Sequence, residues 1–271
     1  MTSLSLLTYN TWKCDGDYQA RLPLMVAEID RLNPDLVFLQ EAFVTPDRLY
    51  DTAGAISRCG AYQITRAEAR RKERICGGVP LDSTSGLAVL SRSPRLASRI
   101  VPLPENPADG ERLALIVEIQ TDVGRLALVN LHLTHLSDGD NLRQHQLMAA
   151  INAIPAHRHA IVAGDFNCLP DAVPAVASRL GSHVIYGSTA AGPHCLAAGT
   201  LNPVVGSDMT DTVRCLDHVL LMGPDRVVPQ VGLKNAEVVI NRPDPVSGLY
   251  ASDHAGVLVH LELVASAGED R

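Results

Sequence analysis

The sequence predicts an α/β fold in which buried strands, some of them antiparallel, alternate with amphipathic helices. Residues 4–9 form a short apolar run that is typical of a buried strand. An amphipathic helix follows and ends at Asn33-Pro34; its apolar residues recur every three to four positions, at Leu22, Met25, Val26, Ile29 and Leu32. Asp122-Val123-Gly124 separates two later apolar runs and predicts a hairpin of antiparallel strands.

Composition limits the number of domains and the class of partner. The chain has 271 residues, 46% of them apolar and 20% charged, and no long Ser/Gly/Pro linker divides it, so we expect one domain over residues 1–271. A net charge of −7 argues against a diffusely basic nucleic-acid-binding protein. It does not exclude a nuclease, because an acidic metal site can contribute much of that charge.

The cysteines and the apolar runs bear on location. Six cysteines are scattered without a CxxC pair or zinc spacing, which favours reduced thiols in a cytoplasmic protein. The N-terminus lacks the pattern of a signal peptide, and no apolar run approaches the roughly 18 residues of a membrane span. The sequence leaves the oligomeric state open.

Two polar residues stand at the ends of the first two predicted strands. Asn10 follows the run 4–9, where a turn or cap role is the alternative to a functional one. Glu41 follows the apolar run 36–39. A carboxylate at the end of a buried strand is costly unless it is paired or binds a metal, so Glu41 is a functional candidate, with a structural salt bridge as the alternative.

The next stretch carries the one concentrated basic run. Residues 46–56 are compatible with a second helix. The basic run, residues 66–74, offers cations to a phosphate-bearing substrate or forms a solvated helix, and the helix is favoured. Glycines and small polar residues at 77–86 predict a loop beside the site.

His132 ends another predicted strand. Short apolar runs at 87–90, 98–103, 113–119 and 125–131 predict four strands. Alternation places Asn130 and His132 on one face, with His135 as an exposed neighbour. A lone histidine at such a position is more often structural than functional.

A helix over residues 138–154 is predicted next. Its inner stripe consists of Leu147, Ile151 and Ile154. Arg143 lies on its first turns, where it either reaches back toward the strand ends as a substrate-binding residue or is an ordinary surface arginine.

The sharpest local pattern is Gly164-Asp165-Phe166-Asn167, after the buried run 160–163. Asp165 and Asn167 share a face by alternation and can hold a metal, orient a water or bind phosphate, although the pattern also suits a turn. Residues 171–180 predict a short helix. Residues 181–212 predict a long loop that rims a substrate cleft.

Two acids accompany the last strands. Asp217 lies near the start of the apolar run 216–221, and Asp253-His254 precedes the final run, residues 255–263. A carboxylate beside an imidazole at the mouth of a strand can bind a metal while the histidine handles a proton.

Six motifs in this order resemble the endonuclease/exonuclease/phosphatase superfamily, which includes DNase I-like nucleases, neutral sphingomyelinases and inositol 5-phosphatases. The motifs are Leu-Thr-Tyr-Asn-Thr-Trp (7–12), Pro-Asp-Leu-Val-Phe-Leu-Gln-Glu (34–41), Val-Asn-Leu-His-Leu (129–133), Gly-Asp-Phe-Asn (164–167), Leu-Asp-His-Val-Leu (216–220) and Ser-Asp-His (252–254). The resemblance implies a four-layered α/β sandwich of two mixed, mainly antiparallel β-sheets flanked by helices.

The resemblance also implies metal-dependent hydrolysis of a phosphate ester, with Mg²⁺ or Mn²⁺ as cofactor. The implied metal residues are Asn10, Glu41 and Asp253, with Asn10 also able to bind the phosphate. Such hard oxygen ligands suit these ions.

Five further residues receive catalytic roles by resemblance. His132 would contact the phosphoryl oxygens, Asp165 would position the attacking water or serve the leaving group, and Asn167 would stabilise the oxyanion. His254 would act as a base or phosphate-binding imidazole oriented by Asp217. Which residue is the general base stays open.

The substrate class rests on weaker features. The repair-nuclease branch usually has Gln-Glu-Thr-Lys and a proline soon after Ser-Asp-His, whereas this chain has Gln-Glu-Ala-Phe and Ser-Asp-His-Ala-Gly. Trp12 is the only tryptophan, so base-stacking platforms are sparse. The chain looks more similar to the sphingomyelinase and phosphodiesterase branch. We expect a phosphodiesterase or phosphatase acting on a small or lipid-derived substrate; the alternatives are a DNA or RNA nuclease and a catalytically silent binding module.

Overall fold

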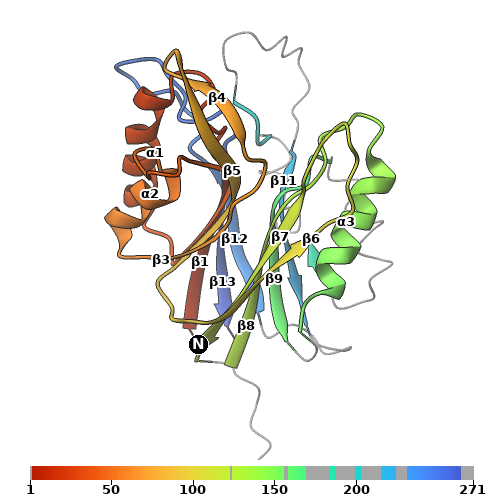
Figure 1. Ribbon diagram of the computed structural model, residues 1–271. Helices are drawn as coiled ribbons and strands as arrows, with labels where there is room; N and C mark the ends of the chain where they lie inside the picture. Colours follow the sequence, from red (N-terminus) through yellow and green to blue (C-terminus); the bar gives the residue numbers. More distant parts are fainter. Residues whose placement is uncertain are drawn as a thin grey trace, which may run out of the picture.

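The computed structural model describes residues 2–122, 124–155, 158–168, 184–186, 199–202, 215–223 and 231–263. Within these residues two β-sheets face each other and helices cover their outer faces (Figure 1). This arrangement confirms the expected α/β sandwich. Among the described residues no helix is long and apolar enough to cross a membrane.

The first sheet has seven described strands in the order β12-β13-β1-β2-β5-β3, with β4 paired to β5. They are β1 (Thr2–Asn10), β2 (Leu36–Val44), β3 (Gln63–Ala67), β4 (Lys72–Cys76), β5 (Val79–Ser91), β12 (Val231–Val239) and β13 (Gly256–Leu263). Only β1 and β2 are parallel; the other pairs are antiparallel. The α1 crossover explains this parallel pair, because parallel neighbours cannot be joined by a tight turn.

The second sheet has six described strands in the order β10-β11-β9-β8-β7-β6. They are β6 (Arg95–Pro102), β7 (Leu113–Thr121), β8 (Gly124–His132), β9 (His159–Asp165), β10 (Val184–Tyr186) and β11 (Asp217–Met222). Strands β8 and β9 are parallel, whereas β7 and β8 form the antiparallel hairpin that the sequence predicts at residues 122–124.

The helices form the two outer layers. Helices α1 (Tyr18–Leu32) and α2 (Thr52–Gly60) lie on the first sheet, and α3 (Asp140–Asn152) lies on the second (Figure 1). Met25 and Ile29 of α1 pack with the outward residues Leu7 and Val37 of the first sheet. Period-2 alternation sends the intervening residues of each strand, such as Leu6, into the core between the sheets.

A buried polar contact joins the two sheets near one edge. Gln40 Nε2 donates to Asn130 Oδ1 at 2.7 Å, and Asn130 Nδ2 donates to the carbonyl oxygens of Leu39 and Ala88, each at 2.9 Å. Because all these groups are removed from water, the contact fixes how β8 sits against β2 and β5.

The predicted second helix exists but with different bounds, and two further predictions between residues 66 and 86 are wrong. The second helix begins at Thr52, because Thr45 and Asp47 close a turn before it and Asp51 caps its first turn through Gly54 N at 2.8 Å. The basic run 66–74 is not a helix: it comprises the end of β3, the connection 68–71 and the start of β4.

The segment 77–86 is likewise a strand and its turn, not a loop. Gly77 and Gly78 adopt left-handed conformations between β4 and β5, and residues 79–86 belong to β5. Gly86 suits a strand interior here, since a Cβ at this position would lie 2.0 Å from the carbonyl oxygen of Ala67.

The remaining described elements differ in part from their predicted bounds. Helix α3 is two residues shorter at each end than residues 138–154, with Leu147 and Ile151 buried and Ile154 packed on the same cluster beyond its end. Of the predicted loop 181–212, residues 184–186 form β10 instead. The predicted helix 171–180 lies outside the described residues.

Candidate active site

The polar strand ends meet at one edge of the two sheets. In each parallel pair, β1 with β2 and β8 with β9, the carboxyl ends lie together. Strands β11 and β13 run antiparallel to these, so their amino ends reach the same edge. The register sets His132 and Asp217 on either side of Asp165. Residues far apart in the sequence are therefore brought together by strand pairing within each sheet and by the packing of one sheet on the other.

Asp165 is at the centre of this edge and is 1% exposed. Its Oδ2 accepts from Asn10 Nδ2 at 3.0 Å and lies 3.5 Å from His132 Nε2, while Oδ1 accepts from Asn167 N at 2.9 Å. Burial and the nearby Asp217 raise the pKa of Asp165 to about 6, although His254 acts in the opposite direction. The carboxylate thus contacts amide, backbone and imidazole groups at once.

The residue before Asp165 explains the close approach of these strands. Gly164 has φ +149°, and a Cβ there would lie 2.0 Å from the carbonyl oxygen of Leu131 on β8. Only glycine fits this contact. The glycine of the Gly-Asp-x-Asn pattern is therefore a packing requirement.

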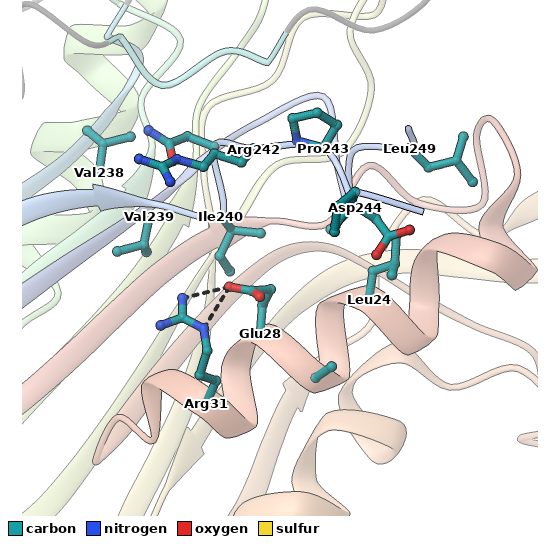
Figure 2. Close-up of a pocket in the computed structure, with 14 residues that line it drawn as sticks. Leu24, Glu28, Arg31, Val238, Val239, Ile240, Arg242, Pro243, Asp244 and Leu249 are labelled. Atoms are coloured by element: carbon teal, nitrogen blue, oxygen red, sulfur yellow. Dashed lines mark hydrogen bonds and ion pairs between the residues drawn. The ribbon is translucent and has the colours of Figure 1, made fainter. Parts of the chain in front are cut away.

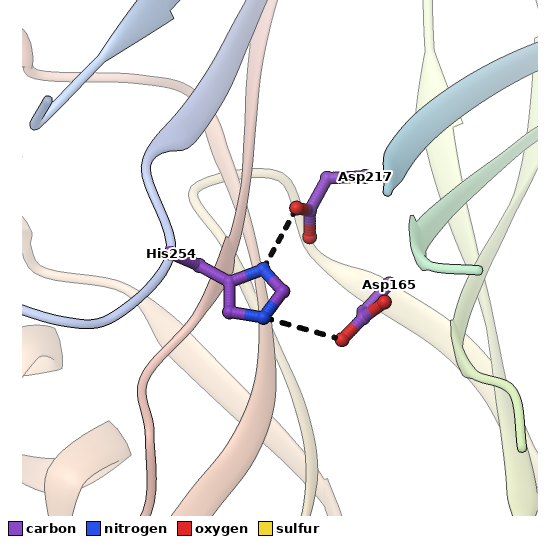
Figure 3. Close-up of side chains that lie close together, drawn as sticks. All are labelled: Asp165, Asp217 and His254. Carbon is purple, nitrogen blue, oxygen red and sulfur yellow. Dashed lines mark hydrogen bonds and ion pairs between the residues drawn. The ribbon is translucent and has the colours of Figure 1, made fainter. Parts of the chain in front are cut away.

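His254 lies between two carboxylates (Figure 3). Its Nδ1 is 2.9 Å from Asp217 Oδ2, and its Nε2 is 3.7 Å from Asp165 Oδ2. Burial acts to lower the pKa of His254, but the charges of Asp217 and Asp165 outweigh it and raise the pKa to about 10. Asp217 is itself fully buried, so it fixes the orientation of the ring from behind. We call Asn10, His132, Asp165, Asp217 and His254 the cleft floor.

His132 differs from His254 in its electrostatic surroundings. Burial lowers the pKa of His132 well below the ordinary value, and the charges of Arg112, His254, Arg70 and Lys13 lower it further. The ring is therefore neutral and can donate a hydrogen bond without carrying charge.

Arg112 and Asp109 support His132 from below and are site residues that the sequence did not reveal. Arg112 is 3% exposed and forms a two-pronged ion pair with Asp109 at 2.8 and 2.6 Å. Its Nη1 approaches the carbonyl oxygen of His132 at 3.5 Å, and His135 Nδ1 lies 2.7 Å from Asp109 Oδ1. The only sequence feature was an i, i+3 acid–base pair in a turn, which is common on surfaces.

Glu41 lines the same cleft as the floor. It has φ +54° at an irregularity in the β2–β5 pairing, a feature that redirects a side chain at a strand edge. Its Oε2 lies 3.1 Å from Lys13 Nζ, which also pairs with Asp15 at 3.0 Å. Burial and the charge of Glu41 raise the pKa of Asp253, while His254 lowers it. Two carboxylates thus face one cleft and repel each other unless a cation lies near them.

Two groups of side chains fit a metal ion by their chemistry. Asp165, Asp217 and His254 have ligand atoms within 4.8 Å of one another, but these atoms are already engaged in the contacts described above. Glu41 and Asp253, with the amide of Asn10 beside them, offer the hard oxygen donors that Mg²⁺ prefers and border the open cleft. The second group fits a divalent ion better, because its carboxylates border the open cleft, whereas Asp217 is fully buried behind His254.

Asn167 and Arg143 occupy different positions relative to the floor. Asn167 lines the cleft, and its Nδ2 donates to the carbonyl oxygen of Leu133 at 3.1 Å. Arg143 donates to the carbonyl oxygens of Thr134 and Leu136 at 3.0 and 2.8 Å and does not line the cleft. Because its guanidinium is hydrogen-bonded within the loop before α3, we do not retain Arg143 as a substrate-binding residue.

The cleft has a volume of about 580 Å³ and is bordered on one side by β4. A larger groove of about 680 Å³ lies between α1 and residues 238–251 (Figure 2). Its charged side chains include the ion pair of Glu28 with Arg31 at 2.7 Å, and none of the strand-end residues lines it. The smaller cleft is the candidate active site, because it gathers the groups with perturbed pKa values.

The two facing mixed sheets, with acids, amides and imidazoles at one edge, define a DNase I-like α/β sandwich. The sequence matches the Endonuclease/Exonuclease/phosphatase family over residues 7–254, so the chain belongs to that family. No curated protein matches it in sequence.

Several solved structures share the fold. A Danio rerio TDP2 humanized by 14 mutations is 20% identical with a TM-score of 0.73, covering 96% of this chain and 99% of that chain. D. rerio TDP2 complexed with single-strand DNA product is 21% identical with a TM-score of 0.71, covering 97% and 100%. A family protein from Beutenbergia cavernae DSM 12333 is 21% identical with a TM-score of 0.70, covering 97% and 72%. At these identities the likeness concerns the fold.

Proposed function

We propose that the protein hydrolyses a phosphate ester with the help of a divalent ion, Mg²⁺ or Mn²⁺, by in-line attack of water. The observation that carries this proposal is the Asp217–His254–Asp165 hydrogen-bonded and ion-paired group on the floor, with Glu41 and Asp253 lining the same cleft. Phosphoryl transfer needs positioned groups and neutralised charge and little covalent chemistry from the protein, which this inventory matches.

Each side chain then has a stated task. Glu41, Asp253 and Asn10 would hold the divalent ion, which when bound supplies positive charge to the phosphoryl oxygens. His254, held as a cation by Asp217, donates a hydrogen bond to a non-bridging oxygen.

The remaining floor residues serve the water and the oxyanion. Asp165 orients the attacking water, since its carboxylate is fixed by Asn10 and Asn167 at 3.0 and 2.9 Å. His132, kept neutral by its surroundings, donates to a phosphoryl oxygen, and Asn167 stabilises the oxyanion from the rim.

For the substrate we infer a small or lipid-derived phosphoester, which is either a phosphodiester or a phosphomonoester. The overall acidic charge and the single tryptophan support this choice over a nucleic acid. The cytoplasm remains the location we predict from the cysteine pattern.

A nuclease is the second candidate. Two observations favour it: one similar structure is a TDP2 complexed with single-strand DNA product, and basic side chains border the cleft here.

The test is a substrate panel with purified protein in Mg²⁺, Mn²⁺ or EDTA. The panel holds bis-p-nitrophenyl phosphate, p-nitrophenyl phosphate, sphingomyelin, plasmid DNA and RNA, each repeated with Asp165→Ala and His254→Ala. We expect turnover of a small or lipid phosphoester that requires the metal and is lost in both variants. Turnover of nucleic acid alone would support the nuclease, and activity that survives in either variant would contradict the roles given above.

A further inference from the structure

The basic run of residues 66–74 is divided by the fold into two kinds of cation. Arg66 and Arg71 form ion pairs with Asp51 and Asp82, at 2.7 and 2.5 Å, and neither lines the cleft. Arg70, Lys72 and Arg74 line the cleft, and none has an ion pair with a described residue. We call these three residues the hairpin wall, because they lead into or lie on the β4–β5 hairpin, which rises beside the edge that carries the floor (Figure 1).

The backbone at Arg70 is held so that the side chain keeps its place. Arg70 has φ +55°, which a non-glycine residue adopts at a cost of about 1 kcal/mol or more. Its N–H donates to Glu111 Oε2 at 3.0 Å, and its carbonyl accepts from Arg74 Nη2 at 2.9 Å. These two contacts hold the unusual backbone conformation from which the Arg70 side chain lines the cleft.

Arg74 adds a second, independent observation. It is 8% exposed, and its Nε has no hydrogen-bond partner among the described residues, although its Nη1 donates to the carbonyl oxygen of Ser83 at 2.9 Å. A buried cation without a carboxylate partner is costly, and an anion in the adjacent cleft would offset that cost. One acid, Glu73, also lines this side, but three cations outnumber it.

The wall lies close to the floor without being part of it. Arg70 is near enough for its charge to act on the imidazole of His132. A smaller recess that adjoins the cleft is lined by Glu41, Arg70, Arg112 and His132 as well. A phosphate held by the floor therefore has beside it cations that form no ion pair with the described residues.

We propose that the hairpin wall is a second anion subsite, which binds a phosphate group that neighbours the scissile one. The proposal rests on the proposed function and deepens it: the preferred substrates are phosphoesters with two phosphate groups. Arginine recognises phosphate through two parallel hydrogen bonds and lysine as a point charge. The second phosphate comes either from the next nucleotide or from a phosphorylated headgroup, and these sources are distinguished in the test.

The test is a calorimetric titration of thymidine 5′-monophosphate and thymidine 3′,5′-bisphosphate in Mg²⁺ buffer. The proteins are the wild type, Arg70→Ala, Lys72→Ala and the matched control Arg71→Ala, a neighbouring arginine outside the cleft. Glycerophosphoinositol and its 4-phosphate form a second ligand pair, and the pair with the larger advantage identifies the source. Melting curves check that each variant is folded.

We expect the doubly phosphorylated ligand of one pair to bind the wild type at least about 10-fold more tightly, or ~1.4 kcal/mol. Arg70→Ala and Lys72→Ala should each remove most of this advantage, whereas Arg71→Ala should keep it. Equal affinity for both members of each pair in the wild type, or an advantage that survives in both wall variants, overturns the proposal.

A parallel assay separates this inference from the proposed function. It follows turnover of thymidine 5′-(p-nitrophenyl phosphate) with and without a 3′-phosphate, and we expect the second phosphate to lower KM and leave kcat nearly unchanged. A binding advantage without turnover here or on the substrate panel above supports the subsite and counts against the hydrolase. Turnover with no advantage in binding or KM supports the hydrolase and overturns the subsite.

Discussion

On the cleft floor the carboxylates, amides and imidazoles are hydrogen-bonded to one another, whereas on the hairpin wall the cations have no carboxylate partner among the described residues. The floor is built on paired strands, whose register fixes where its side chains stand. The wall is built on a two-stranded hairpin at the rim. A closed network on rigid strands suits chemistry that needs fixed geometry, and unpaired rim cations suit recognition of a charged substrate.

The largest expected effect tests whether the floor does the chemistry. His254→Gln should lower kcat on the preferred phosphoester by about 10³-fold, because the substitution removes the cationic donor held by Asp217. The matched control is His260→Gln, an exposed histidine six residues later on β13 that pairs with Glu237, and it should leave kcat unchanged. Equal losses in both variants would mean that the floor has no special role.

A second prediction concerns what keeps the floor in place. Asn130→Ala should lower the free energy of unfolding by about 3 kcal/mol, because Gln40 and the carbonyls of Leu39 and Ala88 lose a buried partner. Urea denaturation measures the change. Asn152→Ala, at the exposed end of α3, should change it by less than about 0.5 kcal/mol. A mild effect at Asn130 would show that the sheets do not need this contact.

The third prediction tests whether the divalent ion is held by Glu41 or by the acids of the floor. Glu41→Gln should weaken Mn²⁺ binding, followed by electron paramagnetic resonance, by at least about 10-fold, since a charged oxygen donor is lost. Asp217→Asn should leave Mn²⁺ affinity within about two-fold, because Asp217 is engaged with His254. The reverse pattern would assign the metal to Asp165, Asp217 and His254.

The smallest effect is expected in the larger groove. Glu28→Ala breaks an exposed i, i+3 ion pair with Arg31 and should change stability by less than about 0.5 kcal/mol and turnover not at all (Figure 2). Steady-state kinetics and urea denaturation check both. A marked loss of turnover would indicate that this groove, and not the cleft, is the active site.

Much of the floor, and Glu41 in the same cleft, was predictable because the signals are local. Apolar runs that end in Asn10, Glu41, His132 and Asp165 need only the composition of adjacent residues to be read as strand ends. Their order along the chain carried the family resemblance, and the family match over residues 7–254 confirms it.

The hairpin wall was mispredicted because its strands are not apolar runs. In β4, Arg74 and Cys76 are buried while Glu73 and Ile75 are exposed, and three charged residues obscure the alternation. Strand β4 exists because it pairs with β5, and composition does not encode which neighbour a strand will find.

The sequence by itself determined which chemical groups the protein has and at which strand ends they stand, because periodicity and chain order are properties of neighbouring residues. Only the tertiary structure decided which of those groups meet. It engaged Arg143 in a loop, placed Arg112 beside the carbonyl of His132, and left Arg70 and Lys72 beside the floor with no ion pair to a described residue. Which charged side chains pair depends on distances across the fold. Burial strengthens each such pair and makes an unpaired group more costly.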